Sequence, residues 1–177
     1  DGELDGLWKK WSENGQLVSE GNYKGNDEHG LCKSWYKNGQ LMKEGNYKDR
    51  CRDGLHKEWY PNGQLKSEGN YISSKPGKTK ILTTKQLPNF EEKDGLHKKW
   101  SENGQLISEC NYKDCKKDGL WKTWNENGQI EYECNYKDGK EDGIEKYYYK
   151  NGQLRRVINY KDGKRDGVMK FYSDNGQ

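Results

Sequence analysis

The sequence lacks alanine altogether, and only 3 of its 177 residues are proline. Because alanine is the strongest helix former, a mainly helical fold is disfavoured. No apolar run approaches the ~20 residues of a membrane-spanning helix. With 32 basic and 29 acidic side chains, neither sign of charge is in large excess, which argues against a dedicated nucleic-acid-binding protein.

Apolar residues are also scarce, at 29% of the chain, while 34% of the residues are charged. Such a composition alone is typical of disorder, because little apolar surface offsets the loss of chain entropy. The 7 tryptophans and 13 tyrosines, however, are unusual in a disordered chain. The two observations together predict an ordered chain without a thick, closed core.

An internal repeat explains most of the 22 glycines. The tripeptide Asn-Gly-Gln recurs every 24 residues, apart from one interval of 41 residues between its third and fourth copies. Each copy separates two short runs that are rich in β-forming residues, which is the pattern of a β-hairpin. The copies begin at Asn14, Asn38, Asn62, Asn103, Asn127, Asn151 and Asn175.

In the third copy a proline precedes the Asn-Gly pair and indicates the type of turn. Proline fixes φ near −65°, so Pro61 suits the first loop position of a type I turn. A three-residue loop then places Gly63 in the left-handed region as a G1 bulge and sets Trp59 opposite Leu65. A two-residue loop would put those two apolar side chains on opposite faces, so we prefer the three-residue loop.

Applied to every copy, this register predicts an all-β protein, an elongated single-sheet antiparallel β-meander built from seven 24-residue hairpin repeats. We expect repeats 1–3 in residues 1–71 and repeats 4–7, the last one truncated, in residues 94–177. Between them, residues 72–93 form an insertion that is either a loop or an extended hairpin. The expected structural residues are a tryptophan/leucine row and the turn glycines: Trp11, Leu17, Trp35, Leu41, Trp59, Leu65, Trp100, Leu106, Trp124, Gly15, Gly39, Gly63, Gly104, Gly128 and Gly152.

The repeat unit resembles the MORN-variant repeat that is common in bacterial proteins. The first unit carries Asp5-Gly6-Leu7-Trp8 and then Asn14-Gly15-Gln16-Leu17, and the likeness covers nearly the whole chain outside the insertion. The resemblance implies an elongated antiparallel meander. For function it implies scaffolds that bind proteins or lipids, or bacterial proteins of an antitoxin-like group, and it carries no catalytic motif onto this sequence.

The face opposite the tryptophan/leucine row changes from repeat to repeat. A face that determines the fold should repeat, whereas a recognition face need not, and exposed aromatic side chains are good binding anchors. Long insertions also often carry function. A solvated face with incidental variation, and an insertion that is tolerated decoration, are the alternatives. The candidate partner-binding residues are Trp8, Glu20, His56, Glu68, His97, Glu109, Trp121, Lys80 and Phe90.

No motif in the sequence predicts a catalytic residue, a cofactor site or enzyme activity. In the predicted register His56, Glu68 and His97 share one row, and such ligands suit zinc. Simple hydrogen bonding between histidine and glutamate is the expected arrangement, so no metal site is predicted. The five cysteines are expected to be thiols, with a Cys110–Cys115 or Cys115–Cys134 disulfide as the alternative.

We therefore expect a non-enzymatic scaffold that binds a protein partner through its variable face. The alternatives are an antitoxin or immunity protein that neutralises a toxin by direct binding, and a surface or membrane-associated module that binds anionic lipid. A homodimer through the tryptophan/leucine row is also left open. Because residue 1 is Asp, we expect part of a longer protein or a trimmed array. The resemblance implies a bacterial protein, and the cytoplasm and a secreted or surface location both stay open. The lipid alternative rests on a lysine ladder formed by Lys9, Lys33, Lys57, Lys98, Lys122, Lys146 and Lys170.

Overall fold

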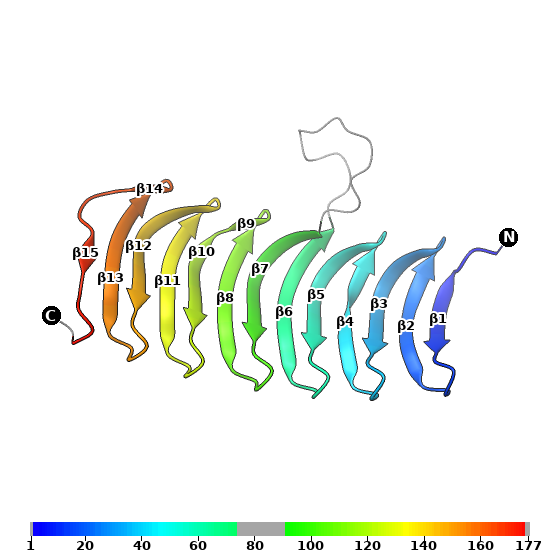
Figure 1. Ribbon diagram of the computed structural model, residues 1–177. Helices are drawn as coiled ribbons and strands as arrows, with labels where there is room; N and C mark the ends of the chain where they lie inside the picture. The colour runs from blue at the N-terminus through cyan, green and yellow to red at the C-terminus, as the bar shows by residue number, and fades with distance from the viewer. Residues whose placement is uncertain (1, 74–90, 176–177) are drawn as a thin grey trace. The chain divides into compact units, whose positions relative to one another are not determined.

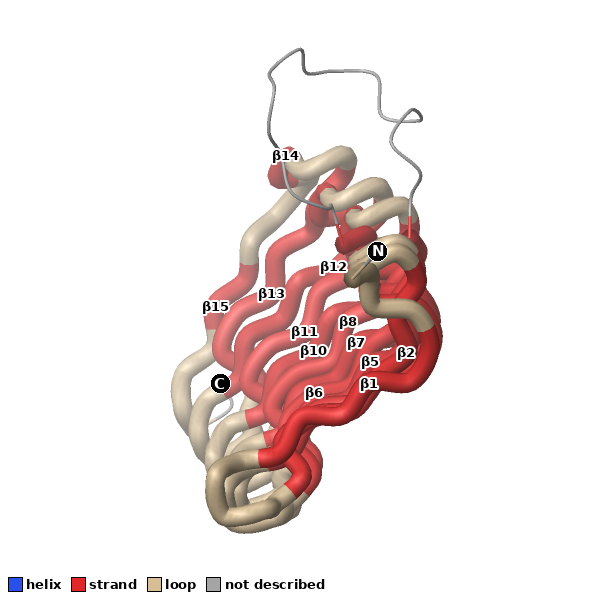
Figure 2. Tube along the Cα trace, turned by 90° about the vertical axis from the view of Figure 1, so that its right-hand side faces the viewer, coloured by secondary structure: helices blue, strands red, loops and turns tan. Residues whose placement is uncertain are grey.

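The computed structural model describes residues 2–73 and 91–175, and β-strands are the only regular secondary structure in these ranges (Figure 2). The prediction of an all-β antiparallel meander is therefore confirmed. The chain divides into two compact units, residues 1–93 and residues 94–177. Over the described ranges the chain forms no helix of the length and apolarity that crossing a membrane requires.

The first unit is an antiparallel meander in which each strand pairs with the next one along the chain (Figure 1). The Asn-Gly turns lie at one end of the strands, and the connections between hairpins lie at the other end. The strands are β1 (Gly6–Trp11), β2 (Leu17–Lys24), β3 (Asp27–Trp35), β4 (Leu41–Lys48), β5 (Cys51–Trp59) and β6 (Leu65–Ser73).

The second unit repeats this arrangement, with β8 pairing both β9 and β10, and β13 pairing both β14 and β15. Its strands are β7 (Glu91–Trp100), β8 (Leu106–Lys113), β9 (Lys116–Lys117), β10 (Gly119–Trp124), β11 (Ile130–Lys137), β12 (Lys140–Tyr148), β13 (Leu154–Lys161), β14 (Lys164–Arg165) and β15 (Lys170–Phe171). β6 extends to Ser73 and β7 begins at Glu91, and residues 74–90 of the predicted insertion lie outside the described residues.

The predicted turn is confirmed in all six hairpins of the described residues. In the third, the Tyr60 N–H donates to the Gln64 carbonyl at 2.8 Å, and the Gly63 N–H donates to the Tyr60 carbonyl at 2.9 Å. Gly63 has a φ of 85°, in the left-handed region, as a G1 bulge requires. Trp59 faces Leu65 as predicted.

A second irregularity follows at once, and the predicted register misses it. Trp59 pairs with Leu65, but the next pair joins Glu58 to Ser67, so Lys66 is an extra residue in β6. The same shift occurs at the same place in every described hairpin. Because a one-residue slip moves side chains to the opposite face, the predicted composition of the two faces is wrong beyond the first pair.

The shifted register gives each unit two chemically distinct faces. On the face that we call the ladder face, lysine and glutamate alternate across the strands, between the tryptophan/leucine row and a row of exposed leucines. On the opposite face, which we call the aromatic face, Trp8, Cys32 and His56 alternate with strand glycines beside a row of tyrosines.

The most buried side chains lie on the aromatic face. Cys134 is fully buried, and Ile158 and His56 are almost so. On the ladder face, Trp11 of the edge strand β1 is 54% exposed, and the other tryptophans of the row are half-buried. The aromatic face is therefore the more deeply buried of the two, and the structural role of the tryptophan/leucine row stays a prediction.

Candidate functional site

The aromatic face of the first unit is built around His56. Its ring lies edge-on to Tyr47 and Tyr71, with ring centroids 5.0 and 5.3 Å apart, and its Nε2 is 2.6 Å from the Asn46 carbonyl oxygen. The ring also covers Gly45, where a Cβ atom would lie 2.0 Å from Nδ1. Burial lowers the pKa of His56 below its ordinary value, so the ring is neutral at neutral pH.

A groove of about 270 Å³ crosses this face beside His56. Two small side chains, Ser19 and Ser34, line it together with Trp8, Tyr23 and other residues of the first three hairpins. Ser34 is only 8% exposed, and its Oγ is buried without a hydrogen-bond partner among the described residues. A buried hydroxyl without a partner is costly, so the packing beneath the groove leaves a polar group unsatisfied.

Charged side chains of both signs border the groove. Arg52 contacts Glu58 at 3.5 Å, and its guanidinium lies 5.0 Å from the centre of the Tyr71 ring. Glu28 pairs with Tyr23 in the register, and burial together with the charge of Glu28 raises the pKa of that tyrosine. The groove therefore combines aromatic walls, hydroxyl groups and mixed charge, as protein-binding surfaces commonly do.

On the second unit the corresponding region of the aromatic face is filled by tyrosines. Tyr132 and Tyr147 occupy the repeat positions of Ser19 and Ser34. Tyr132 and Tyr136 form a buried cluster with Cys134, and two half-buried aromatic residues pack against it. Those two are Trp121 and Tyr147.

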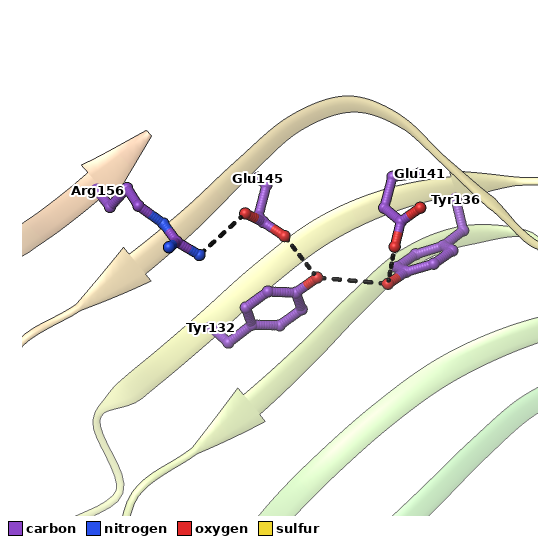
Figure 3. Close-up of polar contacts among 5 residues, drawn as sticks. All are labelled: Tyr132, Tyr136, Glu141, Glu145 and Arg156. Carbon is purple, nitrogen blue, oxygen red and sulfur yellow. Dashed lines mark hydrogen bonds and ion pairs between the residues drawn. The ribbon is translucent and has the colours of Figure 1, made fainter. Parts of the chain in front are cut away.

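Figure 3 shows a chain of polar contacts through this cluster. Arg156 contacts Glu145 at 3.4 Å, and the Tyr132 hydroxyl donates to Glu145 at 3.3 Å. The Tyr132 and Tyr136 hydroxyls are 3.4 Å apart, and Tyr136 donates to Glu141 at 3.3 Å. The chain satisfies the buried hydroxyls, which stabilises a filled face.

Burial keeps the titratable groups of this cluster protonated. It raises the pKa of the Cys134 thiol to about 11 and that of Tyr136 to about 12. The pKa of Tyr132 is also raised, mainly by burial. Because the thiolate is the reactive form of cysteine, Cys134 is poorly suited to nucleophilic chemistry at neutral pH.

The ladder face carries ion pairs between neighbouring strands. Lys9 contacts Glu20 at 3.5 Å, and Lys33 contacts Glu44 at 3.7 Å. A closer contact than these joins Lys146 to Glu133 at 2.8 Å, and there the Tyr148 hydroxyl also donates to the carboxylate at 2.8 Å.

These contacts change the interpretation of the predicted lysine ladder. Five of its lysines face a glutamate of the same hairpin, so the face carries alternating charge rather than a positive stripe. The facing pairs are Lys9–Glu20, Lys33–Glu44, Lys57–Glu68, Lys98–Glu109 and Lys122–Glu133; Lys146 faces Val157 and contacts Glu133 of the preceding strand, and Lys170 pairs with Val157.

The structure divides the predicted partner-binding residues between the two faces. The aromatic and histidine side chains lie on the aromatic face: Trp8, His56, His97 and Trp121. The prediction that Glu20, Glu68 and Glu109 share that face is wrong, because the second bulge turns them to the ladder face. Lys80 and Phe90 lie outside the described residues.

The same correction removes the row of metal ligands. His56 pairs with Gly69, and Glu68 pairs with Lys57 on the other face of the sheet. Within residues 2–73 and 91–175, no group of three or more potential ligands is placed to hold a metal ion. All five cysteines are thiols.

The groove residues Ser19 and Ser34 were missed by the sequence reasoning. Two signals in the sequence point to them. One is the match of Lys9 to Glu20 in successive units, which reveals the true register through charge pairing. The other is the replacement of Ser19 and Ser34 by tyrosine at the equivalent positions of the second unit, which marks where side chains of the two units differ in volume.

In a comparison with known protein families, the chain matches the MORN repeat variant. The match covers residues 4–24, 28–49, 52–73, 93–114, 117–138 and 141–162, well over half of the chain. These six segments coincide with the six hairpins described above. No curated protein matches the chain. The chain belongs to the MORN repeat variant family.

Proposed function

We propose that this chain is a non-enzymatic repeat scaffold that binds a protein partner through the aromatic face of its first unit. One observation carries the proposal: the groove exists where the second unit, built from the same repeat, fills its face with tyrosines. A surface that the fold fills in one unit and leaves open in the other is not required for the fold itself.

The chemistry of the groove favours a protein over other ligands. Its walls combine tryptophan and tyrosine, which are enriched in protein interfaces, with side chains of both charges. Trp8 is half-buried at one end of the groove, where a partner side chain reaches its ring. Among the predicted binding residues on this face, His56 is buried and forms a wall of the groove, and Trp121 packs against the tyrosine cluster of the second unit. Trp8 is therefore the principal aromatic anchor for the partner.

The test fills the groove with the tyrosines that occupy the equivalent positions of the second unit. A Ser19→Tyr, Ser34→Tyr double variant copies the residues of the second unit, and the matched control is Leu7→Thr on the exposed ladder face. Each protein is used for affinity capture from the native cell, followed by mass spectrometry, with far-UV circular dichroism to check the fold.

We expect the filled variant to lose the partner that the wild type and Leu7→Thr both capture. Equal recovery of that partner by the folded double variant would show that the groove is not the binding surface.

A further inference from the structure

In the second unit, the ammonium of a lysine lies against two aromatic rings, in an arrangement that we call the aromatic seat. Its walls are Trp121 and Tyr136, and Glu141 supplies its carboxylate. The Lys117 Nζ lies 3.2 Å from the centre of the Trp121 ring and 4.7 Å from the centre of the Tyr136 ring. Glu141, which accepts a hydrogen bond from Tyr136, lies beside the seat. Ammonium over an aromatic face, near a carboxylate, is a favourable arrangement for a lysine.

The first unit has the same seat in the same register. Trp8 and Tyr23 are edge-on with ring centroids 5.7 Å apart, against 5.9 Å for Trp121 and Tyr136. Glu28 pairs with Tyr23 as Glu141 pairs with Tyr136. The walls and the carboxylate of the seat are therefore both repeated.

The occupant differs between the two seats. Leu4 stands at the repeat position of Lys117, and its backbone is held in the same way. The Asn26 N–H donates to the Leu4 carbonyl at 3.0 Å, and the Gly139 N–H donates to the Lys117 carbonyl at 2.9 Å. Among the described residues, no cation lies over the Trp8 ring.

The seat opens into the groove of the first unit. Trp8, Tyr23 and Glu28 all line that groove, together with Ser34, whose buried Oγ has no described partner. A side chain with a long apolar stem and a cationic end fits this arrangement. The stem lies along the groove, and the ammonium reaches the two rings and the carboxylate.

We propose that Trp8, Tyr23 and Glu28 form a docking seat for a lysine side chain of the partner protein. This inference rests on the proposed function, since it names the chemistry that the groove recognises. The evidence for the occupant comes from the chain itself, which places its own lysine in the equivalent seat.

The test uses two short peptides, acetyl-Gly-Gly-Lys-Gly-Gly-amide and the same peptide with norleucine in place of lysine. Each is titrated into the full chain, and the Trp8 indole N–H resonance is followed by NMR, assigned with a Trp8→Phe variant. We expect a saturable shift with the lysine peptide and an affinity about fivefold or more weaker with the norleucine peptide.

Two variants at an exposed position sharpen the test. Leu4→Lys places a cation of the chain itself over Trp8, as Lys117 lies over Trp121, and should abolish the shift of the Trp8 resonance that the lysine peptide causes. The uncharged Leu4→Met variant should retain that shift. Leu4 is 38% exposed, so neither change disturbs a packed core. An equal response to both peptides, or undiminished binding by a folded Leu4→Lys protein, would overturn the proposal.

The outcome is separable from that of the proposed function. If the groove-filled variant loses its partner while the lysine peptide does not shift Trp8, the scaffold function stands and the lysine seat fails. If the peptide shifts Trp8 while groove filling leaves capture unchanged, the seat binds lysine and the proposed partner surface is wrong.

Discussion

At the scale of single residues, the aromatic face depends on pairs of large and small side chains on neighbouring strands. His56 is buried because Gly45 leaves room for its ring, and Cys32 lies over Gly21 in the same way. Where the second unit replaces these glycines by Cys110, Cys134 and Ile158, the new side chains are themselves buried. The residue at this glycine position therefore determines how closely the side chain opposite it on the neighbouring strand can approach the sheet.

The burial of His56 predicts a pH-dependent stability. Burial lowers the pKa of His56, and this effect outweighs the opposing hydrogen bond to Asn46. Below the unfolded pKa of about 6.5 the unfolded chain therefore binds the additional proton, so the free energy of unfolding falls as the pH drops, and it levels off below the folded pKa. We expect the wild type to lose more stability between pH 7.5 and pH 5.5 than a His56→Gln variant.

Urea unfolding of both proteins at the two pH values measures this difference. A wild type that is as insensitive to pH as the variant, or an NMR titration that places the His56 pKa at or above 6.5, would contradict the assignment.

At the scale of strands and hairpins, the ladder face is held by ion pairs of unequal strength. Glu133 accepts from both Lys146 and Tyr148, and its side chain is only 16% exposed. These donors outweigh the effect of burial and lower its pKa. Glu20 has a single contact with Lys9 at 3.5 Å, and its side chain is 27% exposed.

This contrast predicts different costs for the same substitution. Glu133→Gln should lower the free energy of unfolding by about 1–3 kcal/mol, because the mostly buried carboxylate that accepts from Lys146 and Tyr148 loses its charge. Glu20→Gln should cost less than about 1 kcal/mol, as is usual for an exposed pair. Urea unfolding at pH 7 compares the two, and equal losses would show that the Glu133 contacts add nothing beyond a surface pair.

The sequence predicts the turns and the first pair of each hairpin, because Pro61 and the Asn-Gly pair restrict the local backbone. It does not directly predict the second bulge, because an extra residue such as Lys66 has no fixed side-chain chemistry. The position is occupied by Val18, Met42, Lys66, Ile107, Glu131 and Arg155 in successive hairpins. Only the pairing of lysine with glutamate across the strands reveals it.

At the scale of the whole chain, each unit combines a repeated ladder face with an aromatic face that differs between repeats. The second unit fills its aromatic face with Tyr132 and Tyr147, and the first leaves a groove above Ser19 and Ser34. The candidate site could not be predicted from one repeat, because it appears only when equivalent positions of the two units are compared in the correct register.

The most direct test of this account is hydroxyl-radical footprinting of the chain with and without its captured partner. We predict that Trp8 and Tyr47 on the aromatic face of the first unit become protected in the complex. Trp11 and Leu31 on the ladder face should be labelled equally in both states. Protection of Trp11 and Leu31 with no change at Trp8 would contradict the assignment of the aromatic face as the recognition surface.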